Sequence, residues 1–319
     1  MVWGHRYAFI VINIVFSVAR TSSLCDKIEL IVPPMSGVRA VAMLDSKIYI
    51  LRQKPSCFLV FDEHDLSKTS SEIPLTLLTD PVDVVASQKS ACLYITDKGN
   101  SAVWKFTPTD NNVTSWLQNI GSPYTLSVTS DGRVIRVDQG QPSHLDVYAA
   151  DAQRINHIQL PDIVTVPHHA VETSAGTYMI SYGESNGKNG VCEITRDGSV
   201  VGVFDTLLEA VEGIDPNVNN FLKETFAERK LVYCPRYLAV NEHGEIYATD
   251  PDNGGLMVFD SRLKLEAVIE KDLFIKPVNV HCLKNMRKLL IVYGGEEQPT
   301  VGMFTQKLTL KFCLEHKIL

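Results

Sequence analysis

The sequence has none of the short motifs that identify common metal-binding or catalytic folds. Its seven cysteines form no C-x-x-C pair, which excludes zinc-finger and thioredoxin-type sites because both need closely spaced thiols. A G-x-S-x-G nucleophile motif and a glycine-rich phosphate loop are missing as well. Recognised motifs therefore leave the function of this chain open.

Clusters of positive charge are also missing. The chain has 30 lysines and arginines against 37 acidic residues, a formal net charge of −7 at pH 7. Nucleic acids and anionic membranes are bound through clustered Lys and Arg side chains that release counterions. We therefore expect no nucleic-acid partner.

Only one apolar stretch stands out, and it is too short to cross a membrane. Residues 7–19 follow His5 and Arg6 and end in Ser17-x-Ala19, whereas a membrane span needs about 20 apolar residues. A short apolar core of this kind is typical of a secretory signal peptide. We predict that residues 1–19 are a signal peptide, so that the processed protein is secreted and has no membrane span. The alternative is a cytoplasmic protein whose fold begins with this stretch.

The sequence does contain a repeated motif. A proline or glycine, two variable residues and an apolar run occur six times, starting near residues 37, 81, 123, 167, 235 and 277. The intervals of 44, 42, 44, 68 and 42 residues fit one unit of about 42 residues with a single long insertion. A fixed period in this range is typical of β-propeller blades.

Each motif is followed by further short apolar runs, for example residues 92–97 and 102–106. Turns rich in Gly, Asp and Asn separate these runs. This pattern predicts antiparallel four-stranded sheets. We predict an all-β, six-bladed β-propeller that forms one domain from residue 20 to 319. The insertion, residues 206–230, has Phe221, Leu222 and Phe226 at helical spacing, which predicts one short helix between blades four and five.

Two of the repeats resemble the NHL-repeat family of six-bladed propellers. They are residues 81–106, with Asp97 and Asn100 in the turn, and residues 235–260, with Asp250 and Asn253. The resemblance covers roughly residues 37 to 306 and implies the propeller fold. Some NHL proteins bind RNA or carry a RING domain, but the acidic charge and the missing C-x-x-C pairs argue against both roles here.

The ends of the strands suggest where a ligand would bind. The first strand of a blade begins near the rim where its second strand ends, so polar residues at these positions should share one rim around the central channel. Asp97, Asp138 and Asp250 are interpreted as turn caps. The predicted partner-binding rim residues are Arg39, Asp83, His168, His169, Tyr182, Arg236, Tyr237 and Asn279.

Arg and Tyr often dominate protein recognition, so the sequence favours a non-catalytic module that binds a protein or peptide partner. We predict no catalytic residue, no metal and no cofactor. An intracellular NHL adaptor without a RING domain is one alternative.

A metal-dependent propeller hydrolase or lyase is the other alternative. Peptidylglycine amidating lyases resemble this architecture, and the resemblance implies zinc held by three histidines from different blades. Here only blade four has histidine at the rim, while His144, His157 and His243 fall in turns or outer strands. A gluconolactonase-like calcium site would have to use Asp83, Asn279 and Asp97.

Three further predictions concern the chain ends and one turn. Residues 27–32 and 307–313 both have strand character, so the N-terminal strand should join the last blade and cover its open edge. A disulfide between Cys25 and Cys313 would link the two ends of the chain and stabilise the closed ring. The sequence supports equally well that these two cysteines are unrelated thiols. Asn112 lies in the sequon Asn112-Val-Thr114 and is a predicted glycosylation site in a secreted protein.

Overall fold

The computed structural model describes most of the chain between residues 25 and 306. The described ranges are 25–32, 35–66, 71–121, 125–183, 188–205, 234–269, 276–283, 288–294 and 299–306. The predicted signal peptide, the insertion 206–230 with its helix, and Cys313 lie outside the described residues. Within those ranges, no helix is long and apolar enough to cross a membrane.

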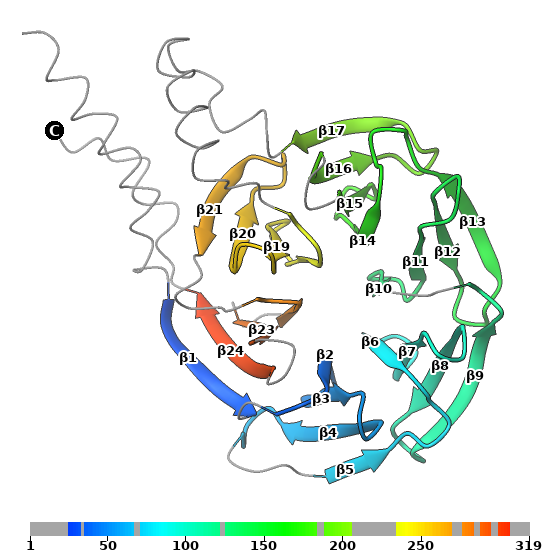
Figure 1. Ribbon diagram of the computed structural model, residues 1–319, viewed down its shortest axis with the longest axis vertical. Helices are drawn as coiled ribbons and strands as arrows, with labels where there is room; N and C mark the ends of the chain where they lie inside the picture. The colour runs from blue at the N-terminus through cyan, green and yellow to red at the C-terminus, as the bar shows by residue number, and fades with distance from the viewer. Residues whose placement is uncertain are drawn as a thin grey trace, which may run out of the picture.

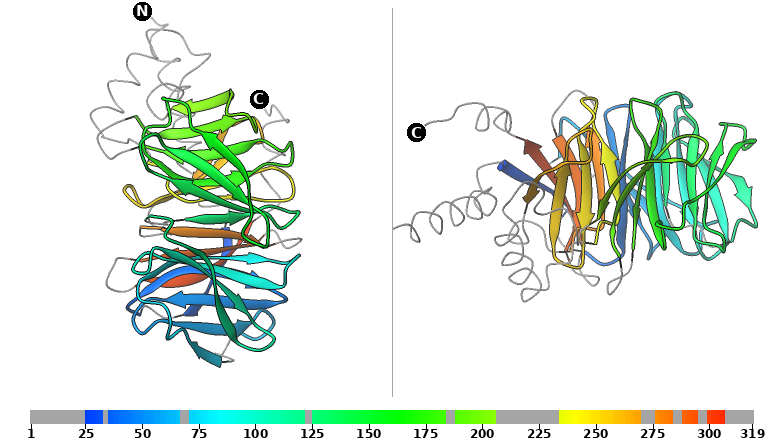
Figure 2. Two further views of the ribbon diagram at one scale, coloured as in Figure 1. Left: turned by 90° about the vertical axis from the view of Figure 1, so that its right-hand side faces the viewer. Right: turned by 90° about the horizontal axis from the view of Figure 1, so that it is seen from above.

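The described strands form six four-stranded antiparallel sheets around a central axis (Figure 1). This arrangement confirms the predicted six-bladed β-propeller, and the side views show the blades standing next to one another around the ring (Figure 2). Blade one contains β2 (Val38–Leu44), β3 (Lys47–Arg52), β4 (Cys57–Asp62) and β5 (Ser71–Pro74), and blade two contains β6 (Pro81–Ser87), β7 (Cys92–Asp97), β8 (Ala102–Thr107) and β9 (Asn112–Gln118).

The remaining blades repeat this order. Blade three contains β10 (Leu126–Val128), β11 (Val134–Asp138), β12 (His144–Tyr148) and β13 (Arg154–Gln159), and blade four contains β14 (Pro167–Glu172), β15 (Tyr178–Tyr182), β16 (Gly190–Ile194) and β17 (Val200–Asp205). Blade five contains β18 (Leu238–Val240), β19 (Ile246–Asp250), β20 (Gly255–Phe259) and β21 (Leu265–Ile269). Blade six contains β22 (Asn279–Leu283), β23 (Lys288–Tyr293) and β24 (Thr300–Gln306), with β1 (Cys25–Val32) added at its outer edge.

The first strand of each blade lies nearest the central axis (Figure 1). Since these six inner strands are joined to their second strands by hairpin turns, the ring has two distinct sides. We call the side where the inner strands begin the entry face, and the side with their hairpin turns the hairpin face. Residues of the central channel can be placed by their position along an inner strand between these two faces.

The N-terminal strand closes the ring. β1 pairs with β24 in antiparallel register, with Ile28 opposite Phe304 and Leu30 opposite Gly302. The prediction that the N-terminal strand joins the last blade is confirmed, and β1 is the outermost strand of that blade. Its partner is β24, while the strand predicted at 307–313 lies outside the described residues.

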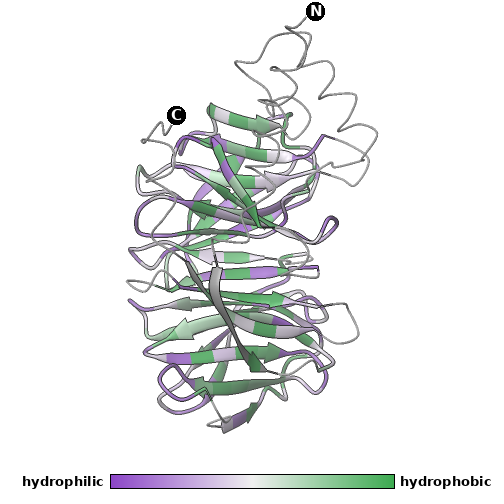
Figure 3. Cartoon of the chain, turned by 90° about the vertical axis from the view of Figure 1, so that its left-hand side faces the viewer, coloured by the Kyte–Doolittle hydropathy of each residue, from purple (hydrophilic) through white to green (hydrophobic). Residues whose placement is uncertain are grey.

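Apolar side chains fill the spaces between blades. β7 is buried along its whole length because successive side chains point to opposite faces of a sheet that is covered on both sides. Leu93 and Ile95 pack toward blade one, whereas Cys92 and Tyr94 pack toward blade three. In the side view of Figure 3, hydrophobic segments alternate with hydrophilic ones along the strands.

One interface differs from the other five. The apolar cluster between blades two and three has five buried residues, whereas the clusters of the other interfaces have ten to thirteen. Trp116 partly replaces the missing contacts, because its ring packs on Tyr94 and Tyr148 and its Nε1–H donates to the Ala150 carbonyl. Partly buried Val85, Leu117, Ile120 and Val128 also pack against this small cluster.

The acidic residues at the ends of second strands organise turns, as predicted. Asp97 accepts hydrogen bonds from the backbone N–H groups of Thr79 and Asp80 and from the Asn100 side chain. Asp250 accepts from the backbone and side chain of Asn253. The Asp-x-x-Asn pattern is therefore a structural feature of the blade.

Removing residues 25–32 should make the protein insoluble. The deletion exposes the N–H and C=O groups of β24 as an unpaired edge, and such edges promote aggregation. Soluble yield and size-exclusion profile measure the effect, with the intact chain as control. A monomeric deletion variant with an unchanged Tm would contradict the role assigned to β1.

Candidate functional site

The central channel contains a cavity of about 890 Å³. Its lining includes the exposed hairpin-turn residues Ser46, Lys89 and His243, so it opens on the hairpin face. Apolar residues from inner strands dominate its walls, and charged residues surround its mouth. The apolar set includes Met43, Val85, Val128, Val171 and Val280, and the charged set includes Lys89, Glu172, Glu242 and Lys288.

At the entry-face end of the inner strands, Asp83 is the centre of a buried polar network. Its carboxylate accepts hydrogen bonds from Leu126 N–H (3.0 Å), from the Tyr237 hydroxyl (3.2 Å) and from Asn279 Nδ2 (3.4 Å). Asn279 Oδ1 in turn accepts from Val41 N–H at 3.4 Å. These contacts link blades one, two, three, five and six.

His169 adds blade four to the same network. Its Nε2–H donates to the Leu126 carbonyl (2.9 Å), and its Nδ1 accepts from Leu238 N–H (3.2 Å). The imidazole also stacks on the Tyr237 ring with 3.9 Å between centroids. One connected set of hydrogen bonds therefore joins the inner strands of all six blades.

Burial sets the protonation of this network. Desolvation raises the pKa of Asp83 to about 7, although the Leu126 and Val84 N–H groups and the Tyr237 hydroxyl act in the opposite direction. Burial lowers the pKa of His169 to about 4, so the ring is neutral at pH 7. Burial and then the charge of Asp83 raise the pKa of Tyr237 well above its usual value. The network thus holds one carboxyl group that titrates near neutral pH.

The calcium site considered from the sequence does not fit this geometry. Asp83 and Asn279 do come together, but each oxygen they could offer already accepts an N–H or O–H group. Asp97 is occupied in its own turn. Calcium needs six or more oxygen ligands, which these three residues do not supply.

A zinc site built on three channel histidines does not fit either. His169 and His281 line the cavity, but both ring nitrogens of His169 are engaged with backbone groups. His168 lies outside the cavity lining, with Nε2 2.7 Å from the Gly183 carbonyl. Since zinc binding requires nitrogen lone pairs directed at one point, we derive no step through zinc in this channel.

The other predicted rim residues lie apart from the cavity. Tyr182 is fully buried in the core of blade four, where a Cβ on Gly190 would come within 2.9 Å of its hydroxyl. Its placement on an accessible rim was wrong, because the last residue of a second strand can point into the blade interface. Arg236 packs against His168, with 3.3 Å between Nη1 and Nδ1, and Arg39 donates to the Gln53 side chain.

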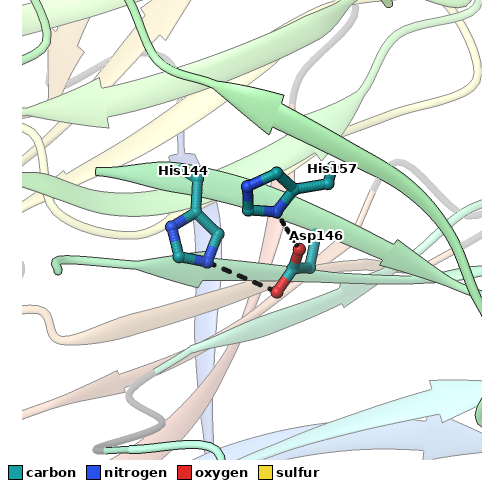
Figure 4. A group of neighbouring side chains, drawn as sticks. All are labelled: His144, Asp146 and His157. Atoms are coloured by element: carbon teal, nitrogen blue, oxygen red, sulfur yellow. Dashed lines mark hydrogen bonds and ion pairs between the residues drawn. The ribbon is translucent and has the colours of Figure 1, made fainter. Parts of the chain in front are cut away.

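A second cluster, which was not predicted from the sequence, lies on the outer strands of blade three. His144, Asp146 and His157 offer ligand atoms that all lie within 4.8 Å of one another (Figure 4). The two histidines had been set aside because turns and outer strands lie far from the channel. The available signal was the spacing His144-x-Asp146, which places both side chains on one face of a strand.

Asn112 and the cysteines complete the predicted set. Asn112 begins β9 and is exposed, as glycan attachment requires. The described cysteines at 57, 92, 192, 234 and 282 are free thiols, whereas the Cys25 side chain and Cys313 lie outside the description. Both the glycosylation site and the terminal disulfide stay predictions.

Comparison with known proteins shows the fold clearly and the family not at all. No family model and no curated protein matches the sequence. Among solved structures, virginiamycin B lyase from Staphylococcus aureus is 9% identical with a TM-score of 0.57, covering 87% of this chain and 99% of its own. A gluconolactonase from Xanthomonas campestris is 14% identical with a TM-score of 0.59, covering 88% and 89%. A luciferin-regenerating enzyme is 9% identical with a TM-score of 0.62, covering 89% and 96%.

These similarities correct the functional prediction. The sequence favoured a non-catalytic module that binds a protein or peptide, yet the structural neighbours named above are enzymes. At such low identity the likeness itself shows the fold alone, so the chemistry must be argued from the residues of this chain.

Asp83 should make the stability of the protein depend on pH. Its folded pKa of about 7 exceeds the value near 3.9 of an unfolded Asp, so the stabilising protonated form is fully present below about pH 4 and is lost as the pH rises through about 7. Three pKa units correspond to about 4 kcal/mol. Wild type should therefore lose stability between pH 4 and pH 8, whereas Asp83→Asn has no group that titrates at this position. The unfolding free energy of the variant minus that of wild type should rise over this range.

Urea denaturation at several pH values measures this difference. Ser181→Ala is the matched control, because it removes a part-buried hydrogen bond between blades four and five but no titrating group. Its stability should run parallel to that of wild type. A difference between Asp83→Asn and wild type that does not change with pH would show that Asp83 is ionised throughout.

Proposed function

We propose that this protein is an acid–base enzyme of the propeller hydrolase or lyase class that acts on a small, largely apolar substrate in the central cavity. The observation that carries the proposal is the position of Asp83, a carboxyl group with a pKa of about 7, beside a cavity-lining tyrosine. Perturbed carboxyl groups of this kind are concentrated at functional sites.

The cavity supports a small-molecule substrate. Its volume of about 890 Å³ falls within the range of roughly 300–1,000 Å³ that is usual for ligand pockets. Apolar walls with a few polar groups are also typical of such pockets. Charged residues at the mouth include Lys89, Glu172 and Lys288. They would contact the polar end of a substrate whose apolar part is bound deeper in the cavity.

Asp83 has the properties of a general base. A base works best when its pKa lies near the operating pH, because it is then both ionised and able to bind a proton. Tyr237 lines the cavity and its hydroxyl hydrogen-bonds to Asp83. It is therefore the route by which a proton would pass from the cavity to the carboxylate. His169 stacks on Tyr237 and fixes the position of its ring.

Hydrolysis of a small ester or lactone is the reaction that this pair fits best. Water adds to the carbonyl carbon while its proton passes through the Tyr237 hydroxyl to Asp83. The acyl–oxygen bond then breaks, and the leaving alkoxide takes the proton back from Asp83. Among proteins with this fold, the gluconolactonase from Xanthomonas campestris carries a lactone substrate in its name, which supports this choice.

The proposal predicts turnover of small esters or lactones by the purified protein. A panel of nitrophenyl esters and five- and six-membered lactones should contain at least one substrate. The value of kcat/KM should rise with pH through about 7, because the base acts in its ionised form. Asp83→Asn should lower kcat/KM by about 100-fold or more, the usual contribution of a general base.

Two further variants separate chemistry from folding. Tyr237→Phe keeps the ring that stacks on His169 and removes only the hydroxyl, so it should lower kcat with little change in KM. Ser181→Ala removes an inter-blade hydrogen bond away from the cavity and should leave activity unchanged. No turnover across the panel, or full activity in a folded Asp83→Asn variant, would contradict the proposal.

A further inference from the structure

Three potential metal ligands converge on one face of blade three, far from the central cavity. His144 and Asp146 are two residues apart on β12, so their side chains project to the same side of the sheet. His157 lies on β13 directly opposite Asp146 in the strand register. Figure 4 shows both imidazole rings turned toward the Asp146 carboxylate. None of the three residues lines the cavity of the proposed enzyme.

The distances are close to those around a small metal ion. The His157 Nδ1 and Asp146 Oδ1 atoms are 2.8 Å apart, and the His144 Nε2 and Asp146 Oδ2 atoms are 3.5 Å apart. Ligand atoms bound about 2.0–2.1 Å from a tetrahedral zinc ion lie roughly 3.4 Å from one another. A modest movement of His157 away from the carboxylate would therefore place all three ligands around one ion.

The orientation of His144 directs its Nε2 atom at carboxylate oxygens. Its Nδ1 atom lies 3.4 Å from the Pro142 carbonyl, which can only accept a hydrogen bond. A proton on Nδ1 leaves a lone pair on Nε2, and this lone pair faces Oδ2 of Asp146 at 3.5 Å and Oδ2 of Asp138 at 3.7 Å. Metal-binding histidines commonly use a carbonyl in this way to direct the other nitrogen at the metal.

From this geometry we propose that His144, Asp146 and His157 form a binding site for a divalent transition metal such as Zn²⁺. Two imidazole nitrogens and a carboxylate are ligands that zinc, cobalt and nickel share, whereas magnesium and calcium prefer oxygen alone. Asp138 lies next to the site, with Oδ2 3.7 Å from His144 Nε2, but this oxygen is paired with Arg136 Nη2 at 2.7 Å. This site differs from the expectation of a metal-free protein, and it is independent of the proposed reaction.

The surroundings hold the carboxylate in place and leave the site accessible. Arg136 donates to Asp146 Oδ2 at 3.0 Å and to the Ile120 carbonyl at 2.6 Å, which ties the cluster to blade two across the least apolar interface. Asp146 is 1% exposed, but His144 and His157 are 20% and 50% exposed. An ion can therefore reach the histidines from solvent.

Arg154 competes with the proposed ion. Its Nη1 atom lies 3.5 Å from Asp146 Oδ1, the same oxygen that His157 contacts, and its side chain is 53% exposed. Because a positive guanidinium disfavours a second cation at this oxygen, neutralising it should strengthen metal binding. Arg154→Gln is thus expected to bind Zn²⁺ more tightly than the wild-type protein does.

Calorimetric titration of the chelator-treated full chain with Zn²⁺ tests the site. Wild type should bind one equivalent, with a Tm that rises on addition of Zn²⁺ and returns on chelation. Co²⁺ at the same site should give visible absorption bands, and Mg²⁺ should give no heat of binding. His144→Ala and His157→Gln should each weaken Zn²⁺ binding by about ten-fold or more.

His64→Ala is the matched control, because it removes an exposed histidine from another blade. It should bind Zn²⁺ as wild type does. Circular dichroism establishes that each variant is folded, and His157 is exposed enough for its replacement to be tolerated. Absence of Zn²⁺ binding by wild type, or equal binding by all variants, would overturn the site. Unchanged affinity in Arg154→Gln would overturn the placement of the ion at Asp146 Oδ1.

Discussion

The propeller depends on how its six inner strands are held together around a channel. A buried hydrogen-bond network contributes to this, with Asp83, His169 and Asn279 each joining strands from different blades. A buried polar group that loses its partner costs free energy, so a network of this kind is favourable only when every member is satisfied. The relative positions of the blades are therefore fixed at the entry-face end of the channel, where the network lies.

This network also explains why a chemically reactive group can be kept there. Asp83 accepts hydrogen bonds from Leu126, Tyr237 and Asn279 in an environment that disfavours charge, and burial raises its pKa to about 7. The same residue thus supports the ring and is suited to proton transfer. In the proposed reaction, stability would be lost at the pH at which Asp83 becomes able to act as a base, a compromise common at enzyme sites.

The interface between blades two and three shows how polarity can be tolerated between blades. Elsewhere the sheets meet through large apolar clusters, but here the buried apolar cluster is small and the buried Arg136 side chain, paired with Asp146, donates to the Ile120 carbonyl across the interface. Arg136 and Asp146 are both buried and paired, so neither charge is left uncompensated. Replacing apolar packing with such a cluster gains little stability, which is why we interpret it as a binding site.

The sequence by itself determined the repeat, the strand pattern, the turn chemistry of Asp97 and Asn100, and the closing role of the N-terminal strand. These features follow from residues close together in the chain and from the need to cover an open edge. Only the tertiary structure decided that Asp83 contacts Asn279, 196 residues away, that Tyr182 is buried, and that His157 meets Asp146. Such contacts depend on strand register and on the rotation of each blade about the channel, and no local pattern specifies either.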